Sequence, residues 1–200
     1  MILTIENYPE SAHTLALETM FADRKAQFVD FFDWDVPVVD GRYEIDQFDT
    51  AAAVYIVAIG ADGRHEASLR MLPSWLPHLL GDIFPHLCIG GVPVGPRIWE
   101  STRLCLPSRH GAARRRELRN ALISAMADFA LARGIEQITG VIPDGFRREV
   151  LAMGWRAEPL GPASRIEGGP IGAFCIAVTP DMRERLSWTG TWAGPLEMAA

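Results

Sequence analysis

The spacing of apolar side chains changes along the chain between helical and extended periods. Apolar residues recur every three to four positions in three stretches, a pattern that predicts helices. These stretches are 11–32, 112–133 and 145–153. Continuous or alternating apolar runs predict strands, and these are 54–59, 65–72, 98–106, 137–142 and 173–178. Gly134 follows the longest helical stretch and suits its C-cap.

The segments between these elements are polar or rich in turn-forming residues. Residues 61–63 predict a hairpin turn, and the acidic segment 33–50 predicts irregular structure. The Pro- and Gly-rich segment 73–96 predicts loops with at most a short helix around 79–84. The tail from Ser187 receives no assignment. The element order predicts a mixed α/β sandwich around a mostly antiparallel sheet, and 200 residues suit a single core.

Composition narrows the class of protein. Hydrophobic residues make up 48% and charged residues 22% of the chain, the balance of a folded protein. The first eleven residues lack the basic flank and apolar run of a signal peptide, and five prolines exclude a membrane helix in 71–96. Three widely spaced cysteines fit no disulfide framework or zinc pattern, so we expect a cytoplasmic protein.

Charge is distributed unevenly. The net charge of −6 argues against a nucleic-acid partner. Residues 1–50 carry eleven carboxylates and three cationic side chains, whereas the remaining residues carry fourteen and sixteen. Arginine outnumbers lysine eighteen to one, a bias that a GC-rich genome explains. That bias does not explain a cluster of five arginines, Arg109, Arg114, Arg115, Arg116 and Arg119.

Arg24 lies on the apolar face of the first predicted helix, between Phe21 and Phe28. Its side chain either extends along the helix to water or is buried and paired with carboxylates, because an unpaired buried charge is unstable. Carboxylates follow in the run Glu44-Ile45-Asp46-Gln47-Phe48-Asp49. That run otherwise suits a solvated loop, and no His or Asn accompanies it at the spacing of metal ligands.

Further charged residues fall inside predicted strands. Arg70 lies near the end of the strand 65–72, and Glu100 and Arg103 lie in the strand 98–106. Three arginines and up to four carboxylates in otherwise apolar elements are best explained as one buried ionic cluster. Such clusters favour functional sites.

These residues, taken in order, resemble the acyl-homoserine-lactone (autoinducer, LuxI-type) synthases of quorum sensing. The matching positions are Arg24, Phe28, Trp34, Glu44, Asp46, Asp49, Arg70, Glu100 and Arg103. The likeness extends to Gly154-Trp155, which is similar to the family's Gly-Trp after its second long helix. The resemblance implies one domain over residues 1–200 with a GNAT-like acyltransferase fold, an α+β sandwich whose mixed central sheet is flanked by helices.

The resemblance also implies a reaction. An acyl group passes from acyl carrier protein or acyl-CoA to the amine of S-adenosylmethionine, and lactonisation releases methylthioadenosine. S-adenosylmethionine is a substrate here, and neither a cofactor nor a metal is expected. The acidic N-terminal segment suits this cationic molecule, and an arginine fork suits its carboxylate. Phe28 and Trp34 either offer aromatic faces to the ligand or pack in the core.

Roles follow for the remaining residues. Glu100 is the expected base, directly or through a water, and either Arg103 or Arg70 holds the methionine carboxylate. By resemblance the acyl chain lies against a set of residues that are otherwise ordinary core, namely Leu104, Met126, Gly140, Ile142 and Phe146. The arginine cluster at 109–119 is expected to dock the anionic donor at a helix N-terminus, or else forms a solvated turn.

Two other functions explain less of the pattern. A GNAT-type N-acetyltransferase using acetyl-CoA accounts for the fold but not for the ionic cluster. A sensor that binds S-adenosylmethionine or an acyl group without turnover is the non-catalytic alternative. We expect a monomer that binds neither nucleic acid nor membrane, and the acyl chain length stays open.

Overall fold

The computed structural model describes residues 1–166 and 168–193. These residues form two compact units. The first comprises residues 1–71, 103–125 and 193, and the second comprises 72–102 and the described part of 126–192. The expectation of one domain stays a prediction, and each unit is described by itself.

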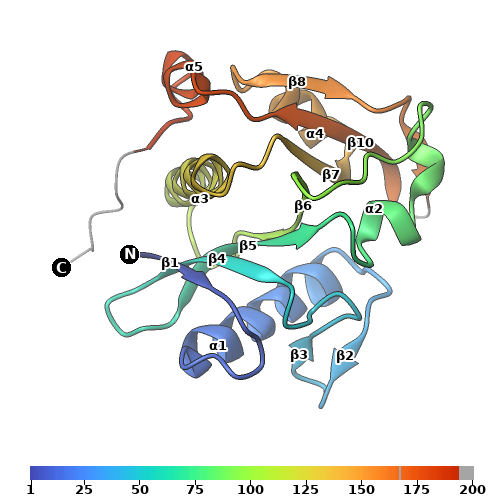
Figure 1. The fold of residues 1–200 in the computed structure, drawn as a ribbon. Helices are drawn as coiled ribbons and strands as arrows, with labels where there is room; N and C mark the ends of the chain where they lie inside the picture. Colours follow the sequence, from blue (N-terminus) through green and yellow to red (C-terminus); the bar gives the residue numbers. More distant parts are fainter. Residues whose placement is uncertain (167, 194–200) are drawn as a thin grey trace. The chain divides into compact units, whose positions relative to one another are not determined.

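The first unit contains an antiparallel sheet. Its strands are β1 (Ile2–Ile5), β4 (Val54–Ile59) and the first seven residues of β5 (His65–Pro73), with β4 in the middle (Figure 1). The predicted strands 54–59 and 65–72 are confirmed, and Gly63 turns the hairpin with φ +78°. The short strand β1 escaped prediction because only Ile5 of its four residues is buried.

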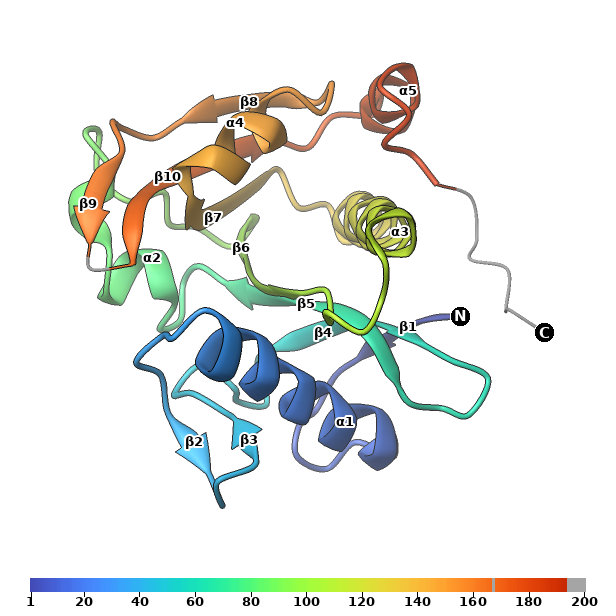
Figure 2. The same cartoon turned by 180° about the vertical axis from the view of Figure 1, so that it is seen from behind.

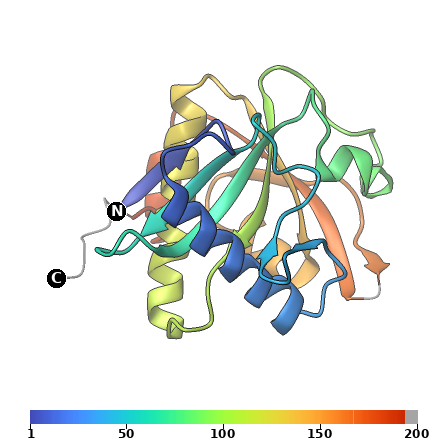
Figure 3. The same ribbon diagram turned by 90° about the horizontal axis from the view of Figure 1, so that it is seen from below.

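A helix lies along one face of this sheet (Figure 3). α1 (Thr14–Arg24) begins three residues later than predicted and continues as a π-helix over Lys25–Phe31. Its buried face carries Leu17, Phe21 and Arg24, at the predicted spacing. The expectation of irregular structure over 33–50 is wrong for β2 (Val38–Val39) and β3 (Tyr43–Glu44), a hairpin too short to show a period.

The second unit contains a mixed sheet. β7 (Gln137–Pro143) pairs in parallel with β6 (Ile98–Cys105) and antiparallel with β10 (Gly169–Ala177). β10 also pairs with β8 (Arg156–Pro159) and β9 (Ser164–Ile166), as Figure 2 shows. A parallel pair requires a crossover connection, and α3 (Ala112–Ala132) supplies it between β6 and β7. β8 and β9 were not predicted, since neither has a buried residue.

Short helices complete the second unit. α2 (Leu79–Asp82) and a 3₁₀ turn (Pro85–Leu87) lie in the segment predicted to hold one short helix, and α4 (Asp144–Leu151) matches the predicted 145–153. α5 (Met182–Trp188) was not predicted. Of the unassigned tail, residues 194–200 lie outside the described residues. Along 1–166 and 168–193, no helix has both the length and the apolar character needed to cross a membrane.

The structure explains why residue 154 is a glycine. Its φ of +101° favours glycine, and a side chain at that position would collide with the backbone carbonyl of Arg185. The next residue, Trp155, is buried and donates an N–H to the carbonyl of Val150 at 2.6 Å. The Gly-Trp pair therefore fixes the turn that leads from α4 into β8.

Candidate active site

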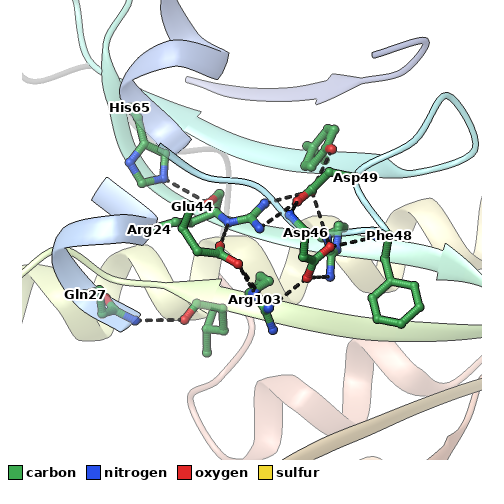
Figure 4. Close-up of polar contacts among 12 residues, drawn as sticks. Arg24, Gln27, Glu44, Asp46, Phe48, Asp49, His65 and Arg103 are labelled. Atoms are coloured by element: carbon green, nitrogen blue, oxygen red, sulfur yellow. Dashed lines mark hydrogen bonds and ion pairs between the residues drawn. The ribbon is translucent and has the colours of Figure 1, made fainter. Parts of the chain in front are cut away.

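Three arginines and three carboxylates meet in the first unit (Figure 4). The arginines come from α1, β5 and β6, and the carboxylates from β3 and the loop after it. The members are Arg24, Arg70, Arg103, Glu44, Asp46 and Asp49. We call this set the ionic cluster. Its formal charges cancel, and its six residues are among those that the sequence predicted to form one buried ionic cluster.

Arg24 is fully enclosed by its partners. Its Nε donates to Glu44 at 2.5 Å, and its two terminal nitrogens donate to the two oxygens of Asp49 at 2.9 Å each. The side chain of Arg24 is 1% exposed, which rules out the alternative in which it extends to water. Burial disfavours the cation, but Asp49 and Glu44 outweigh that effect and raise the pKa of Arg24.

Asp49 is the centre of the ionic cluster. Besides Arg24 it pairs with Arg70 at 2.8 Å and accepts the Tyr55 hydroxyl at 2.9 Å. Tyr55 and Arg70 are direct partners on β4 and β5, so the sheet register aims both at one carboxylate. Burial favours the protonated acid, yet Arg24 and Arg70 hold the pKa of Asp49 well below its usual range.

Arg103 occupies an unusual position in β6. Its φ of +52° is rare for a residue with a side chain and directs the guanidinium toward Glu44 at 3.1 Å and Asp46 at 2.7 Å. These bonds use Nε and Nη2, while Nη1 makes no hydrogen bond with any residue in the described part of the chain. The side chain is 8% exposed, against 1% for Arg24 and Arg70. Arg103 therefore has an unused donor group.

Aromatic rings lie beside Arg103. Its guanidinium carbon is 5.6 Å from the centre of the Phe28 ring, and Phe28 stacks on Trp34 with centroids 5.0 Å apart and planes 8° apart. Phe28 is buried, whereas Trp34 is half-buried and Phe32, which stacks on it, is exposed. The two predicted aromatic residues thus lie together next to a cation, with one ring accessible.

Gln27 is a positioning residue that the sequence did not reveal. Its amide donates to the carbonyl of Leu104 at 3.1 Å and accepts the N–H of Leu106 at 2.8 Å, which ties the π-helix to the strand carrying Arg103. No pattern in the sequence indicates this role, because a glutamine on a helix is usually solvated.

Glu100 lies in the second unit. It is completely buried, and its two carboxylate oxygens accept the N–H groups of Leu79 and Leu80, both at 2.8 Å. These two bonds anchor the start of α2 to β6. Its part in catalysis stays a prediction.

The predicted acyl positions fall in both units. Met126, Gly140, Ile142 and Phe146 belong to the second unit, and Leu104 belongs to the first. Gly140 lies opposite Phe174 on β10, and a methyl group at residue 140 would lie 2.7 Å from the Phe174 ring. The ring of Phe174 therefore occupies the space that a side chain at position 140 would need.

Three of the five arginines at 109–119 form hydrogen bonds or ion pairs with other residues of the chain. Arg109 donates to Asp23 at 2.6 Å and to the carbonyl of His65, so part of its hydrogen-bonding capacity is used within the fold, and its docking role stays a prediction. Two more are also engaged: Arg114 pairs with Glu66 and Glu117, and Arg119 bonds Asn120. Arg115 and Arg116 are exposed and form no ion pair within the described residues.

A second polar network has the connectivity of a catalytic triad. His65 lies 2.6 Å from Asp23 and 2.9 Å from the hydroxyl of Ser68. Ser68 is 1% exposed, so no substrate reaches its oxygen, and we assign the network a structural role. Burial lowers the pKa of His65 despite the opposing effect of Asp23.

The carboxylates of the ionic cluster are occupied by arginines rather than arranged around a metal ion. In the part of the chain that the structure describes, no group of three or more His, Cys, Asp or Glu residues has a metal-binding arrangement. All three cysteines are buried free thiols.

Sequence comparison relates the chain to known enzymes. A family model described as autoinducer synthase matches residues 8–186. An acyl-homoserine-lactone synthase of Ralstonia nicotianae is 35% identical over 158 residues, which are 76% of this chain and 76% of that protein. An isovaleryl-homoserine lactone synthase of Bradyrhizobium diazoefficiens is 30% identical over 174 residues, 84% of this chain and 74% of that one.

Comparison with solved structures indicates the class of protein to which the fold belongs. A putative N-acetyltransferase from Lactobacillus plantarum matches with a TM-score of 0.59 at 16% identity, over 90% of this chain and 98% of that one. MesI, a CoA-dependent acyl-homoserine lactone synthase, matches with 0.85 at 27% identity, over 97% of each chain. TofI with an inhibitor and MTA matches with 0.76 at 25% identity, over 94% of this chain and 96% of that one.

These similarities confirm the expected class, an acyltransferase with a GNAT-like fold. Within that class, the chain belongs to the autoinducer synthase family. The resemblance noted from the ionic residues is therefore confirmed over most of the chain.

Proposed function

We propose that this protein is an acyl-homoserine-lactone synthase in which Arg103 holds the carboxylate of S-adenosylmethionine. The observation that carries the assignment is the unused Nη1 of Arg103, at the least buried arginine of a charge-balanced cluster. A carboxylate placed there gains a charge-assisted hydrogen bond. Arg70 suits this role less well, because its guanidinium is enclosed by Asp46 and Asp49.

The aromatic stack supports the same location. The accessible ring of Trp34, backed by Phe28, offers a face to the sulfonium or the adenine of the ligand. Arg24, Glu44, Asp46, Asp49 and Arg70 form the rigid base that fixes Arg103. Since the cluster is neutral, it holds Arg103 in place without repelling a ligand that is cationic overall.

Acyl transfer requires the amine in its neutral form. A free α-amine has a pKa of roughly 8, so a modest base suffices, and Glu100 is proposed for this step, directly or through a water. The carboxylate then displaces the thioether from the γ-carbon, closing the lactone. Because the sulfonium is already a good leaving group, this second step depends mainly on the geometry that Arg103 imposes.

The donor is an acyl thioester, and acyl-CoA is the first candidate because MesI, at 27% identity, is described as CoA-dependent. Acyl carrier protein is the other candidate. Arg115 and Arg116, both exposed near the start of the 21-residue helix α3, suit the phosphates of either donor. The acyl positions keep their proposed role, with Phe174 limiting the space above Gly140. We also propose a cytoplasmic monomer.

The assay is direct. Purified protein is incubated with S-adenosylmethionine and a panel of acyl-CoA and acyl-carrier-protein donors, and mass spectrometry follows lactone and methylthioadenosine together. Equal amounts of the two products are expected with at least one donor. Acetylated amines would instead indicate an N-acetyltransferase, and binding without any product would indicate a sensor. Arg42→Ala, an exposed change away from the ionic cluster, is the matched control for Arg103 variants.

A further inference from the structure

The side chain of Gln27 binds the end of β6 as a neighbouring strand would. Figure 4 shows it directed at the strand that carries Arg103. Its amide donates to the carbonyl of Leu104 at 3.1 Å and accepts the N–H of Leu106 at 2.8 Å. A residue of a paired strand uses the same two kinds of group, one N–H and one C=O. Gln27 therefore restrains the backbone on both sides of the buried Cys105, and all these residues belong to the first unit.

The restrained segment directly follows Arg103, whose backbone conformation is unfavourable. A residue with a side chain keeps a φ such as +52° only where the surrounding contacts hold it there. At the side-chain end, the guanidinium of Arg103 is held by Glu44 and Asp46. At the backbone end, the residues that follow it are held by Gln27. The direction of the unused Nη1 thus depends on Gln27 as well as on the ionic cluster.

Gln27 also belongs to the segment that carries the aromatic stack. It lies in the π-helix Lys25–Phe31, a geometry that is frequent at functional sites. The next residue, Phe28, places its ring 5.6 Å from the guanidinium carbon of Arg103 and stacks on Trp34. The carbonyl of Gln27 accepts the N–H of Phe32 at 3.1 Å, which closes the helix just before Trp34. Gln27 thus joins the segment with the rings to the segment with Arg103.

We propose that Gln27 sets the affinity for S-adenosylmethionine by fixing Arg103 relative to the stack of Phe28 and Trp34. This inference rests on the proposed function, in which Arg103 holds the carboxylate and the stack faces the sulfonium or the adenine. These groups lie at different places along one ligand. Both contacts form without loss of affinity only if their separation is fixed before binding. Gln27 is therefore a positioning residue that acts through Arg103 and touches no ligand atom.

The first test replaces Gln27 by methionine, which is unbranched and of similar length but lacks the amide donor and acceptor. Isothermal titration calorimetry measures the Kd for S-adenosylmethionine in the absence of turnover. We expect this Kd to rise by about tenfold, the loss that one weakened hydrogen bond produces. The KM for S-adenosylmethionine should rise with it, and the KM for the acyl donor should not change. Gln47→Met, the same substitution at an exposed glutamine, is the control and should bind like the wild type.

The second test asks whether Gln27 acts through Arg103. In the Arg103→Lys background the forked contact with the carboxylate is already lost, so little remains for Gln27 to align. Adding Gln27→Met to Arg103→Lys should therefore change the Kd for S-adenosylmethionine by less than about twofold. A glutamine that only stabilised the fold would lower Tm without this dependence on residue 103. The same tenfold loss in both backgrounds would overturn the proposal.

Another variant keeps the proposal testable if Gln27→Met does not fold, which circular dichroism checks. Gln27→Asn retains an amide but is one methylene shorter, so at least one of the bonds to Leu104 and Leu106 is lost and the Kd should again rise. An unchanged Kd in either folded variant would overturn the proposal while leaving the proposed function intact. Absence of S-adenosylmethionine binding and of lactone with the wild-type protein would refute the proposed function instead, so the two failures are distinguishable.

Discussion

Replacing Arg24 by alanine should destabilise the protein by about 3–5 kcal/mol, the range for removing one partner of a buried ion pair. The substitution deletes hydrogen bonds of 2.5, 2.9 and 2.9 Å to Glu44 and Asp49, whose side chains are 0% exposed. The ionic cluster then holds three carboxylates and two arginines, which leaves one uncompensated negative charge without access to water.

The assay is urea or thermal unfolding followed by circular dichroism, near neutral pH. For a chain of this size, Tm falls by about 2–4 °C for each kcal/mol of stability lost, so we expect Tm to decrease by about 6–20 °C. Arg42→Ala is the control, because Arg42 is exposed and rests on the Tyr43 ring, and it should change stability by less than about 1 kcal/mol. Adding Asp49→Asn to Arg24→Ala should recover part of the loss, since it removes the stranded charge. A loss below about 1 kcal/mol, or no recovery in the double variant, would refute this account.

Three further predictions concern Arg103 at the proposed carboxylate site, the proposed docking residues Arg115 and Arg116, and the buried His65. Arg103→Lys keeps the charge but loses the forked geometry, so lactone kcat/KM should fall by about 100-fold with the fold intact, and wild-type turnover would contradict this. Reversing Arg115 and Arg116 to Glu should raise the donor KM, with a smaller effect at high salt, and leave the KM for S-adenosylmethionine unchanged; unaltered donor kinetics at low salt would exclude docking there. Because burial lowers the pKa of His65 in the folded state, the unfolded chain takes up the proton first, so the free energy of unfolding should decrease as pH falls below about 6.5. His65→Gln should flatten that dependence, and an equal slope in both proteins would assign it to other groups.

The sequence by itself determined the main elements and the identity of the ionic residues. Long apolar patterns, such as those of α3 and β4, were predictable from the sequence. A helix buried on one face has apolar residues at helical spacing, and a strand buried on both faces has a continuous apolar run. Arg24 was visible as a charge on an apolar face. Such a charge needs partners wherever it is buried, so the carboxylates downstream could be proposed with it.

Only the tertiary structure decided which polar atoms of those residues have a hydrogen-bond partner and which have none. The bond distribution that leaves Nη1 of Arg103 unused depends on a φ of +52°, which no spacing rule indicates. Gln27 was overlooked because a glutamine on a helix is usually solvated, and its bonds to Leu104 and Leu106 become apparent only when the strand is placed beside the helix. Hydrogen-bond satisfaction depends on contacts between residues distant in the chain, such as Glu100 with Leu79 and Leu80, so local pattern does not encode it.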